Sequence, residues 1–368
     1  MNPSVKPKPL ESMKTSYDEQ RRQGVLKNLW IAFALAILVS LWKFMTDRQS
    51  FVEGYFYGFL FVVGIPIGAL GIWIIHTLTG GAWGLVIKKY YVAMAWSLPI
   101  AFVLGLPNLF WLHRIYGWMN VSPEMLASKS LYLNQPFFLL RTVLYFAIWL
   151  GSLYWLSGPQ RFNLAGLLGV LYVFSGTFAS IDWVMSIDYH WYSTMFGILS
   201  VEGRVLLGYC FLIVLFIFFE NPQPRPEEAF VFRDLGNLLL VMVMLWAYMS
   251  FAQFLIIWMG NLPEEINWYL PRIKGGWGFV ACSLIVGHFF IPFLLLLRRA
   301  FKKDPQTLIG IALWVIVMRC MDIAWTVFPA LGRTLSQMSL GHVAAALSVV
   351  SLYFIILMNG KTWRHEPN

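Results

Sequence analysis

Ionisable side chains inside long apolar stretches are the residues of this chain most able to do chemistry. One stretch carries Glu202 and Arg204, and another carries Arg319 and Asp322. A charge at the centre of a bilayer costs at least about 2.5–3.5 kcal/mol, so each of these residues needs a partner or a role. They are therefore the first candidates for a functional site.

Helical spacing limits how these four residues can pair. Glu202 and Arg204 are separated by roughly 200° around a helix, so each must reach a different neighbouring helix. Arg319 and Asp322 are three residues apart on one face, which favours an ion pair that either fixes helix register or takes part in function. Pairing of Arg319 with Glu202, or of Arg204 with Asp322, is the alternative across helices.

Histidines add a second type of candidate. His288 lies deep within an apolar stretch, whereas His76 and His342 lie near the ends of two others. A neutral imidazole titrates near a pH of about 6.5 and can pass protons, so His76 and His288 are candidate members of a proton relay. The structural alternative is that His76 and His342 cap helix ends or contact water. The histidine spacing does not fit a haem b held between helices.

A polar run from Ser180 to Thr194 joins two apolar stretches and contains Asp182, Asp188 and His190. These side chains can release protons at a membrane surface or line a pocket for a quinol head group. A packed loop with capped helices is the structural alternative. The run has no nucleophile with an adjacent base and no metal motif of fixed spacing. Arg141, in a neighbouring stretch, is expected to snorkel or to contact lipid phosphate.

Composition places all of these residues in a membrane protein. The 368 residues are 59% apolar and 12% charged, against about 45–50% and about 25% in a soluble domain. Mean hydropathy is +0.65, which excludes a soluble globular or disordered chain. The net charge of +9 lies in tails and short connections, so lipid rather than nucleic acid is expected around the chain. Three cysteines without paired spacing exclude iron–sulfur clusters, covalent haem and a disulfide framework.

Ten apolar runs are long enough to cross a bilayer as helices. They cover residues 27–45, 52–77, 84–111, 136–156, 163–180, 192–219, 233–259, 275–298, 306–329 and 341–358. Gly64-Ile-Pro66 in the second run and Gly105-Leu-Pro107 in the third are candidate helix breaks, although a single proline commonly only kinks a helix. The chain thus divides into an N-terminal tail (1–26), a transmembrane domain (27–358) and a C-terminal tail (359–368).

The distribution of basic residues predicts the orientation. The N-terminal tail and the connections on its side hold 17 Lys and Arg residues, and the opposite connections hold 7. Under the positive-inside rule, both termini are expected in the cytoplasm.

Four segments resemble the F subunit of alternative complex III, a bacterial quinol:electron-acceptor oxidoreductase whose F subunit is similar to the NrfD-like membrane subunit of polysulfide reductase. The segments are Asp182–Gly197, His288–Phe293, Arg319–Trp325 and His76–Gly84. The resemblance extends over nearly all ten spans.

The resemblance implies an all-α protein of the bacterial inner membrane. Spans two to five and six to nine are expected to form two four-helix bundles, flanked by spans one and ten. It implies no cofactor in this chain. Haem c, iron–sulfur clusters and menaquinol are expected in partner subunits: an NrfD-like C subunit, an iron–sulfur subunit and multihaem cytochrome c subunits.

The implied role is that of a structural subunit and a candidate proton path in respiratory or photosynthetic electron transport to cytochrome c or another periplasmic acceptor. The path would enter at His76 and leave at Asp182, Asp188 and His190. Between these ends lie the interior candidates Glu202, Arg204, His288, Arg319 and Asp322. Two alternatives remain: the chain is itself the quinol-binding subunit, or it is a secondary transporter that uses the same charges.

Overall fold

The computed structural model describes residues 10–158, 161–222 and 229–360, and these residues contain helices but no strand. Ten of the helical segments are long and apolar enough to cross a membrane, as predicted. Residues 1–9 of the expected N-terminal tail and 361–368 of the C-terminal tail lie outside the described residues.

Eight of these spans are single helices, and two are series of shorter helical pieces. The spans are α1 (Leu10–Thr46), α2 (Arg48–Thr79), the series α4 (Lys88–Ala95), α5 (Leu98–Gly105), η1 (Leu106–Trp111) and α6 (Leu112–Ile115), then α8 (Gln135–Leu156), α9 (Arg161–Trp183), α10 (Thr194–Glu220), α11 (Ala229–Gly260), the series α14 (Trp277–Ser283), η5 (Leu284–Phe290) and α15 (Ile291–Leu297), then α17 (Pro305–Ala330) and α18 (Leu340–Asn359). The connections carry α3 (Ala82–Val86), η2 (Gly117–Asn120), α7 (Pro123–Leu126), η3 (Ala127–Leu131), η4 (Met185–Asp188), α12 (Pro263–Ile266), α13 (Leu270–Ile273), α16 (Arg299–Lys303) and η6 (Leu335–Gln337).

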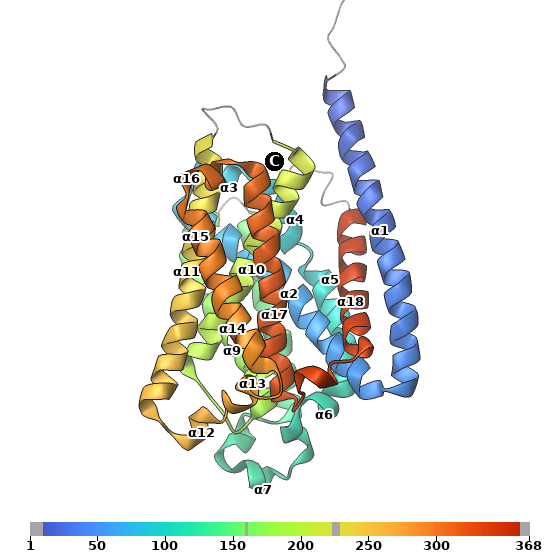
Figure 1. Ribbon diagram of the computed structural model, residues 1–368, viewed down its shortest axis with the longest axis vertical. Helices are drawn as coiled ribbons and strands as arrows, with labels where there is room; N and C mark the ends of the chain where they lie inside the picture. Colours follow the sequence, from blue (N-terminus) through green and yellow to red (C-terminus); the bar gives the residue numbers. More distant parts are fainter. Residues whose placement is uncertain (1–9, 159–160, 223–228, 361–368) are drawn as a thin grey trace, which may run out of the picture.

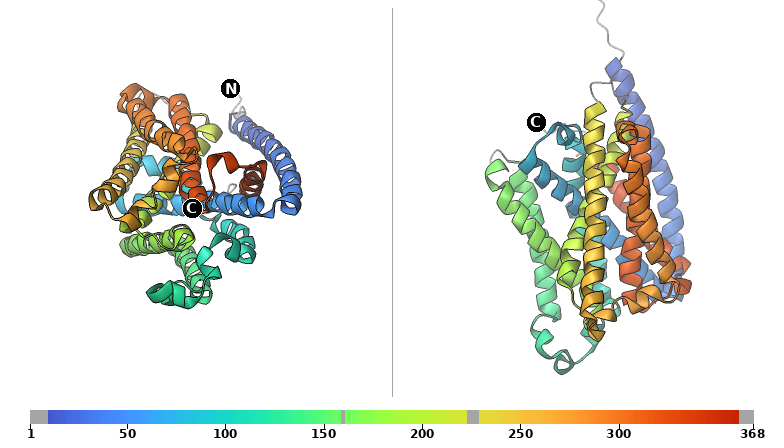
Figure 2. Two further views of the ribbon diagram at one scale, coloured as in Figure 1. Left: turned by 60° about the horizontal axis from the view of Figure 1, so that its bottom comes forward. Right: turned by 60° about the vertical axis from the view of Figure 1, so that its left-hand side comes forward.

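The spans form two four-helix bundles and a flanking pair, as expected. In the first bundle, α2 packs against α4, α5, α8 and α9; in the second, α10 and α17 pack with α11 and the α14–α15 series. The helices α1 and α18 lie side by side along α2 (Figure 1; Figure 2, left). We call the end of the molecule where α1 begins and α18 ends the inner end, after the predicted orientation, and the opposite end the outer end.

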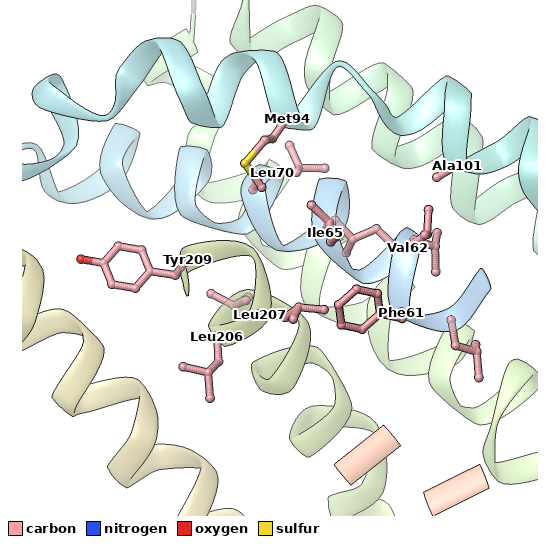
Figure 3. Packing of buried hydrophobic residues seen from close by; sticks show 14 of the residues in the cluster. Phe61, Val62, Ile65, Leu70, Met94, Ala101, Leu206, Leu207 and Tyr209 are labelled. Carbon is pink, nitrogen blue, oxygen red and sulfur yellow. The ribbon is translucent and has the colours of Figure 1, made fainter. Parts of the chain in front are cut away.

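Close packing of α2 against α10 joins the two bundles. A β-carbon on Gly208 would lie 2.7 Å from the backbone nitrogen of Ala69, so the helices approach this closely only because Gly208 has no side chain. Large apolar side chains fill the space on either side (Figure 3): Phe61, Val62, Ile65 and Leu70 of α2, and Leu206 and Leu207 of α10. The contact therefore fixes the position of α10, which carries Glu202 and Arg204.

Irregular backbone occurs in two spans. The 3₁₀-helix η1 begins directly after Gly105, where the Gly-Leu-Pro sequence predicted a break. The break predicted at Pro66 is wrong, because α2 runs through that residue without interruption. In the eighth span η5 is a π-helix that contains His288, and the sequence did not predict it. The π-helix forms because Pro292 has no N–H to donate and its ring displaces the backbone carbonyl of His288, four residues earlier.

Candidate functional site

The predicted ion pair within α17 is present in the interior of the second bundle. Arg319 Nη1 donates to Asp322 Oδ2, and the indole N–H of Trp246 on α11 donates to the same oxygen over 3.2 Å. The two charged side chains are only 7% and 14% exposed. Neither cross-helix alternative occurs, since no ion pair joins Arg319 to Glu202 or Arg204 to Asp322 in the part of the chain that the structure describes.

Glu202 lies next to this pair, and its carboxyl group has no hydrogen-bond partner among the described residues. It is buried on α10 and interacts electrostatically with Arg319 and Asp322. The adjacent Gly203 allows this approach, because a β-carbon there would overlap the Arg319 guanidinium group. A buried polar group without a partner is rare and requires an explanation, such as a bound water or a retained proton.

Arg204 points to a different neighbour, as the helical spacing predicted. Its Nη1 donates to the backbone oxygen of Gly176 on α9 over 3.2 Å, and its guanidinium carbon lies 5.9 Å from the centroid of the Trp183 ring. Arg204 is buried and has no acidic partner among the residues described. The second bundle therefore contains a cation without an ion pair close to the Arg319–Asp322 pair.

His288 completes the interior group. It is fully buried, and neither ring nitrogen has a hydrogen-bond partner among the described residues. Its ring packs edge-on against Trp246, with 3.9 Å between the ring centroids. Because the same indole donates to Asp322, Trp246 links His288 to the ion pair. The sequence did not predict this role for Trp246, since tryptophan is common at span ends and in apolar cores alike.

A cavity of about 960 Å³ lies against this group in the second bundle. Arg204, Arg319 and Asp322 contribute to its wall, and Gln253 adds an amide oxygen that has no partner among the described residues. Most of the remaining lining side chains are apolar or aromatic. Its volume is within the range of about 300–1,000 Å³ that is typical of ligand sites.

The expectation that Arg141 contacts lipid is wrong. Arg141 is 7% exposed, and its Nε and Nη2 donate to the two carboxylate oxygens of Asp182 over 2.8 and 3.0 Å. The hydroxyl of Tyr145 donates to Asp182 Oδ2 over 2.6 Å. A two-point hydrogen-bonded ion pair satisfies both charges inside the protein, so Arg141 has no reason to reach the lipid phosphates.

The polar run between α9 and α10 does not form a single cluster. Asp182 points to α8, whereas Asp188 in η4 interacts electrostatically with Arg272 of α13. His190 is exposed, and the centroid of its ring lies 4.0 Å from the centroid of the Tyr189 ring. The three predicted exit residues thus have three different surroundings.

Arg272 is a buried residue that sequence analysis counted only as a loop charge. It is 1% exposed and donates to the backbone oxygens of Trp268 and Thr326, both over 2.6 Å. Its guanidinium carbon lies 3.7 Å from the Trp268 ring centroid. Burial lowers the pKa of Arg272 to about 9, and Asp188 partly opposes this shift. The available signal was the pair of aromatic residues that precedes it, since arginine stacks on such rings.

At the inner end, His76 is half-buried and makes two hydrogen bonds. Its Nε2 lies 3.1 Å from the carbonyl oxygen of Gly81, and its Nδ1 lies 3.0 Å from the hydroxyl of Tyr91. A carbonyl only accepts, so Nε2 carries a proton and Nδ1 of the neutral ring accepts from the tyrosine. His76 is therefore joined to the start of the third span.

Glu53 is a second buried charge that sequence analysis missed, although it lies inside the predicted second span. Its carboxylate accepts from Arg333 over 2.9 Å, from Gln49 over 2.8 Å and from Nε2 of His342 over 3.1 Å. The Ser339 backbone N–H donates to Nδ1 of His342, so this histidine caps α18 as predicted. It is 3% exposed, and the alternative of contact with water is wrong.

Comparison with known protein families finds no family that the sequence matches, and a search of curated proteins finds no match either. Among the described residues, no group of three or more His, Cys, Asp or Glu side chains gathers in the way that a metal ion requires.

The nine predicted site residues occupy three places. The interior group brings together Glu202, Arg204, His288, Arg319 and Asp322 from α10, η5 and α17. His76 lies at the inner end, and Asp182, Asp188 and His190 lie toward the outer end. No chain of hydrogen bonds within the described part of the structure joins the three places, because Glu202 and His288 have no side-chain partners there.

The Arg141–Asp182 pair gives a test of a structural role. We expect Asp182→Asn to lower the free energy of unfolding by about 3–5 kcal/mol, because Arg141 then stays buried without a counter-charge. Thermal unfolding of the purified protein in detergent measures this. The control is Asp234→Asn, which removes an exposed acid whose ion pair is worth about 0–1 kcal/mol. Equal midpoints for the two variants would show that the pair does not hold α8 to α9.

Proposed function

We propose that this chain is an integral membrane subunit of a quinol-oxidising assembly of the alternative complex III type, and that its interior ionisable residues carry protons. The observation that supports this most directly is Glu202, a buried acid without a hydrogen-bond partner among the described residues, beside the Arg319–Asp322 ion pair. Membership of this assembly is proposed because four segments of the chain resemble the F subunit of that complex. The bacterial inner membrane and cytoplasmic termini belong to the same proposal.

Two opposing effects act on the carboxyl group of Glu202. Its dry surroundings favour the neutral acid, whereas the nearby guanidinium of Arg319 favours the carboxylate. When such effects nearly balance, a carboxyl group gains and loses a proton at small cost. Asp322 is held differently, because Arg319 and Trp246 both donate to its carboxylate. Glu202 is therefore the better candidate for the group that changes charge.

Water must connect this interior group to the two surfaces. The cavity beside it has room for several water molecules, and Arg204, Asp322 and Gln253 on its wall supply polar partners. At the inner end, His76 and Tyr91 offer an entrance, while Asp188 and Arg272 offer charged groups near the outer end. We propose that protons travel between these residues through water.

We expect Glu202→Gln to reduce the number of protons translocated per quinol oxidised by at least about half, because the amide keeps the shape but cannot ionise. The measurement is the pH change on quinol oxidation by the intact complex in proteoliposomes. Asp322→Asn is the second variant and should also lower it, while Asp234→Asn serves as the exposed control. A proton stoichiometry that stays unchanged in both interior variants would contradict the proposed path.

The proposal that the chain belongs to this assembly leads to a separate prediction. Purification of the chain from its native membrane in mild detergent should recover further polypeptides, including one with the absorbance of c-type haem and one with iron–sulfur clusters. Absorbance spectroscopy and peptide mass spectrometry measure this. Recovery of the chain alone, without a cytochrome signal, would count against the complex and favour the transporter alternative.

A second candidate function is that the chain binds the quinol itself. The cavity favours it, because a large apolar and aromatic volume with a few converging polar groups is what a quinone ring and its hydrocarbon tail require. Arg204 and Arg319 on the wall can donate to quinone oxygens, and Asp322 can accept from a quinol hydroxyl.

Photolabelling distinguishes quinol binding by this chain from a role in proton transfer alone. If quinol binds here, a photoreactive quinone analogue should label α11 or α17 near Trp246 and Ile323, and excess menaquinone should prevent the labelling. Labelling that is confined to a partner subunit would leave this chain without a quinol site.

A further inference from the structure

Basic side chains gather at the inner end of the second bundle, where α16 lies against α11. We call Arg233, Arg298, Arg299, Lys302 and Lys303 the inner basic patch. On α16, residues 299, 302 and 303 follow the i, i+3, i+4 spacing and therefore share one face of the helix. Arg299 and Lys303 are exposed, whereas Lys302, at the edge of this face next to α11, is buried.

Lys302 is held in a fixed position within this patch. It is 7% exposed, and its Nζ donates to Oδ1 of Asn237 over 2.7 Å. Its hydrocarbon stem crosses α11 at Gly236, where a β-carbon would lie 2.6 Å from Lys302 Cγ. Gly236 and Asn237 are one turn after Arg233 on α11, so the Lys302 ammonium group lies near the Arg233 side chain.

Among the described residues, the patch and its surroundings hold more positive than negative charge. Burial lowers the pKa of Lys302, and the nearby positive charges of Arg299 and Arg233 lower it further. Of the two acids close by among the described residues, Asp234 pairs with Arg233 over 3.4 Å, and Asp304 accepts the Thr307 backbone N–H over 2.9 Å as the cap of α17. No acid pairs with Lys302 within the segments that the structure describes. Like charges held this close repel each other unless an anion lies among them.

An apolar strip continues from the patch toward the middle of the membrane. On α15, the helix that leads into α16, the side chains of Ile291, Leu294 and Leu297 are exposed at successive turns. A free phosphate needs only the cations, and an acidic protein or nucleic acid needs no apolar surface at this depth. A lipid with an anionic head group uses both, because its acyl chains lie along the helix below its phosphate.

We propose that the inner basic patch binds an anionic glycerophospholipid. Arg299 and Lys303 contact its phosphate, Lys302 and Arg233 keep the local field positive, and the acyl chains pack along the exposed strip of α15. Juxtamembrane basic residues attract anionic lipids in this way, and fixed side chains make the attraction specific to one place. The site is independent of the proton path and of quinol.

Native mass spectrometry of the full chain in detergent tests this proposal by titration with phosphatidylglycerol and, separately, with phosphatidylcholine. We expect the double variant Arg299→Gln with Lys303→Gln to bind phosphatidylglycerol at least about tenfold more weakly. Binding of phosphatidylcholine should not change. The single variant Lys303→Gln changes only one exposed side chain, should weaken phosphatidylglycerol binding about threefold, and serves if the double variant does not fold.

The matched control is Arg48→Gln with Lys274→Gln, which removes two exposed charges at the outer end and should leave the binding intact. The proposal is overturned if the control and the patch variant lose the same affinity, since that would be unspecific attraction to net charge. It is also overturned if neither loses affinity. Tight binding of soluble glycerol 3-phosphate that matches the lipid would instead identify a phosphate site.

Discussion

The cost of placing a charge where no water can reach it explains the arrangement of polar side chains in this protein. Asp182 and Glu53 each accept hydrogen bonds from several donors, and these bonds offset the cost of burying the charge. Asp182 lies inside the first bundle, and Glu53 lies at its outer edge. Such groups bind one helix to another and have little freedom to change charge. Asp182 joins α9 to α8 in this way, and Glu53 joins α2 to α18.

The second bundle is different because the buried groups that it leaves without partners among the described residues include an acid and a histidine, whereas in the first bundle the unpartnered group is the neutral amide oxygen of Asn108. Glu202, His288 and one oxygen of Gln253 belong to this set, and all three lie close to the ion pair or on the cavity beside it. A stable membrane protein tolerates such groups only where bound water, a proton or a ligand compensates them. The contrast between the bundles is the reason for placing function in the second one.

The hydropathy pattern was sufficient to predict ten spans, since a bilayer imposes their length, and the i, i+3 spacing was sufficient to predict the Arg319–Asp322 pair. Contacts across helices were not predictable from one sequence. Arg141 could face lipid or protein equally well until α9 placed Asp182 beside it. Arg272 looked like an ordinary loop charge because its burial depends on how Trp268 folds over it. Glu53 was overlooked because it lies one residue inside a long apolar run.

The π-helix of the eighth span has a consequence for how that span accommodates change. A π turn holds one residue more than an α-helical turn, so η5 shifts the rotational phase of α15 relative to α14. The half formed by α14, which packs against α17, and the half formed by α15, which packs against α11, are thereby aligned independently with their neighbours. Removal of a single residue from this segment would convert the π turn into an α-helical turn and leave the side chains beyond it in register. The eighth span can consequently lose one residue at η5, whereas a deletion in a regular α-helix would rotate every side chain beyond it by about 100°.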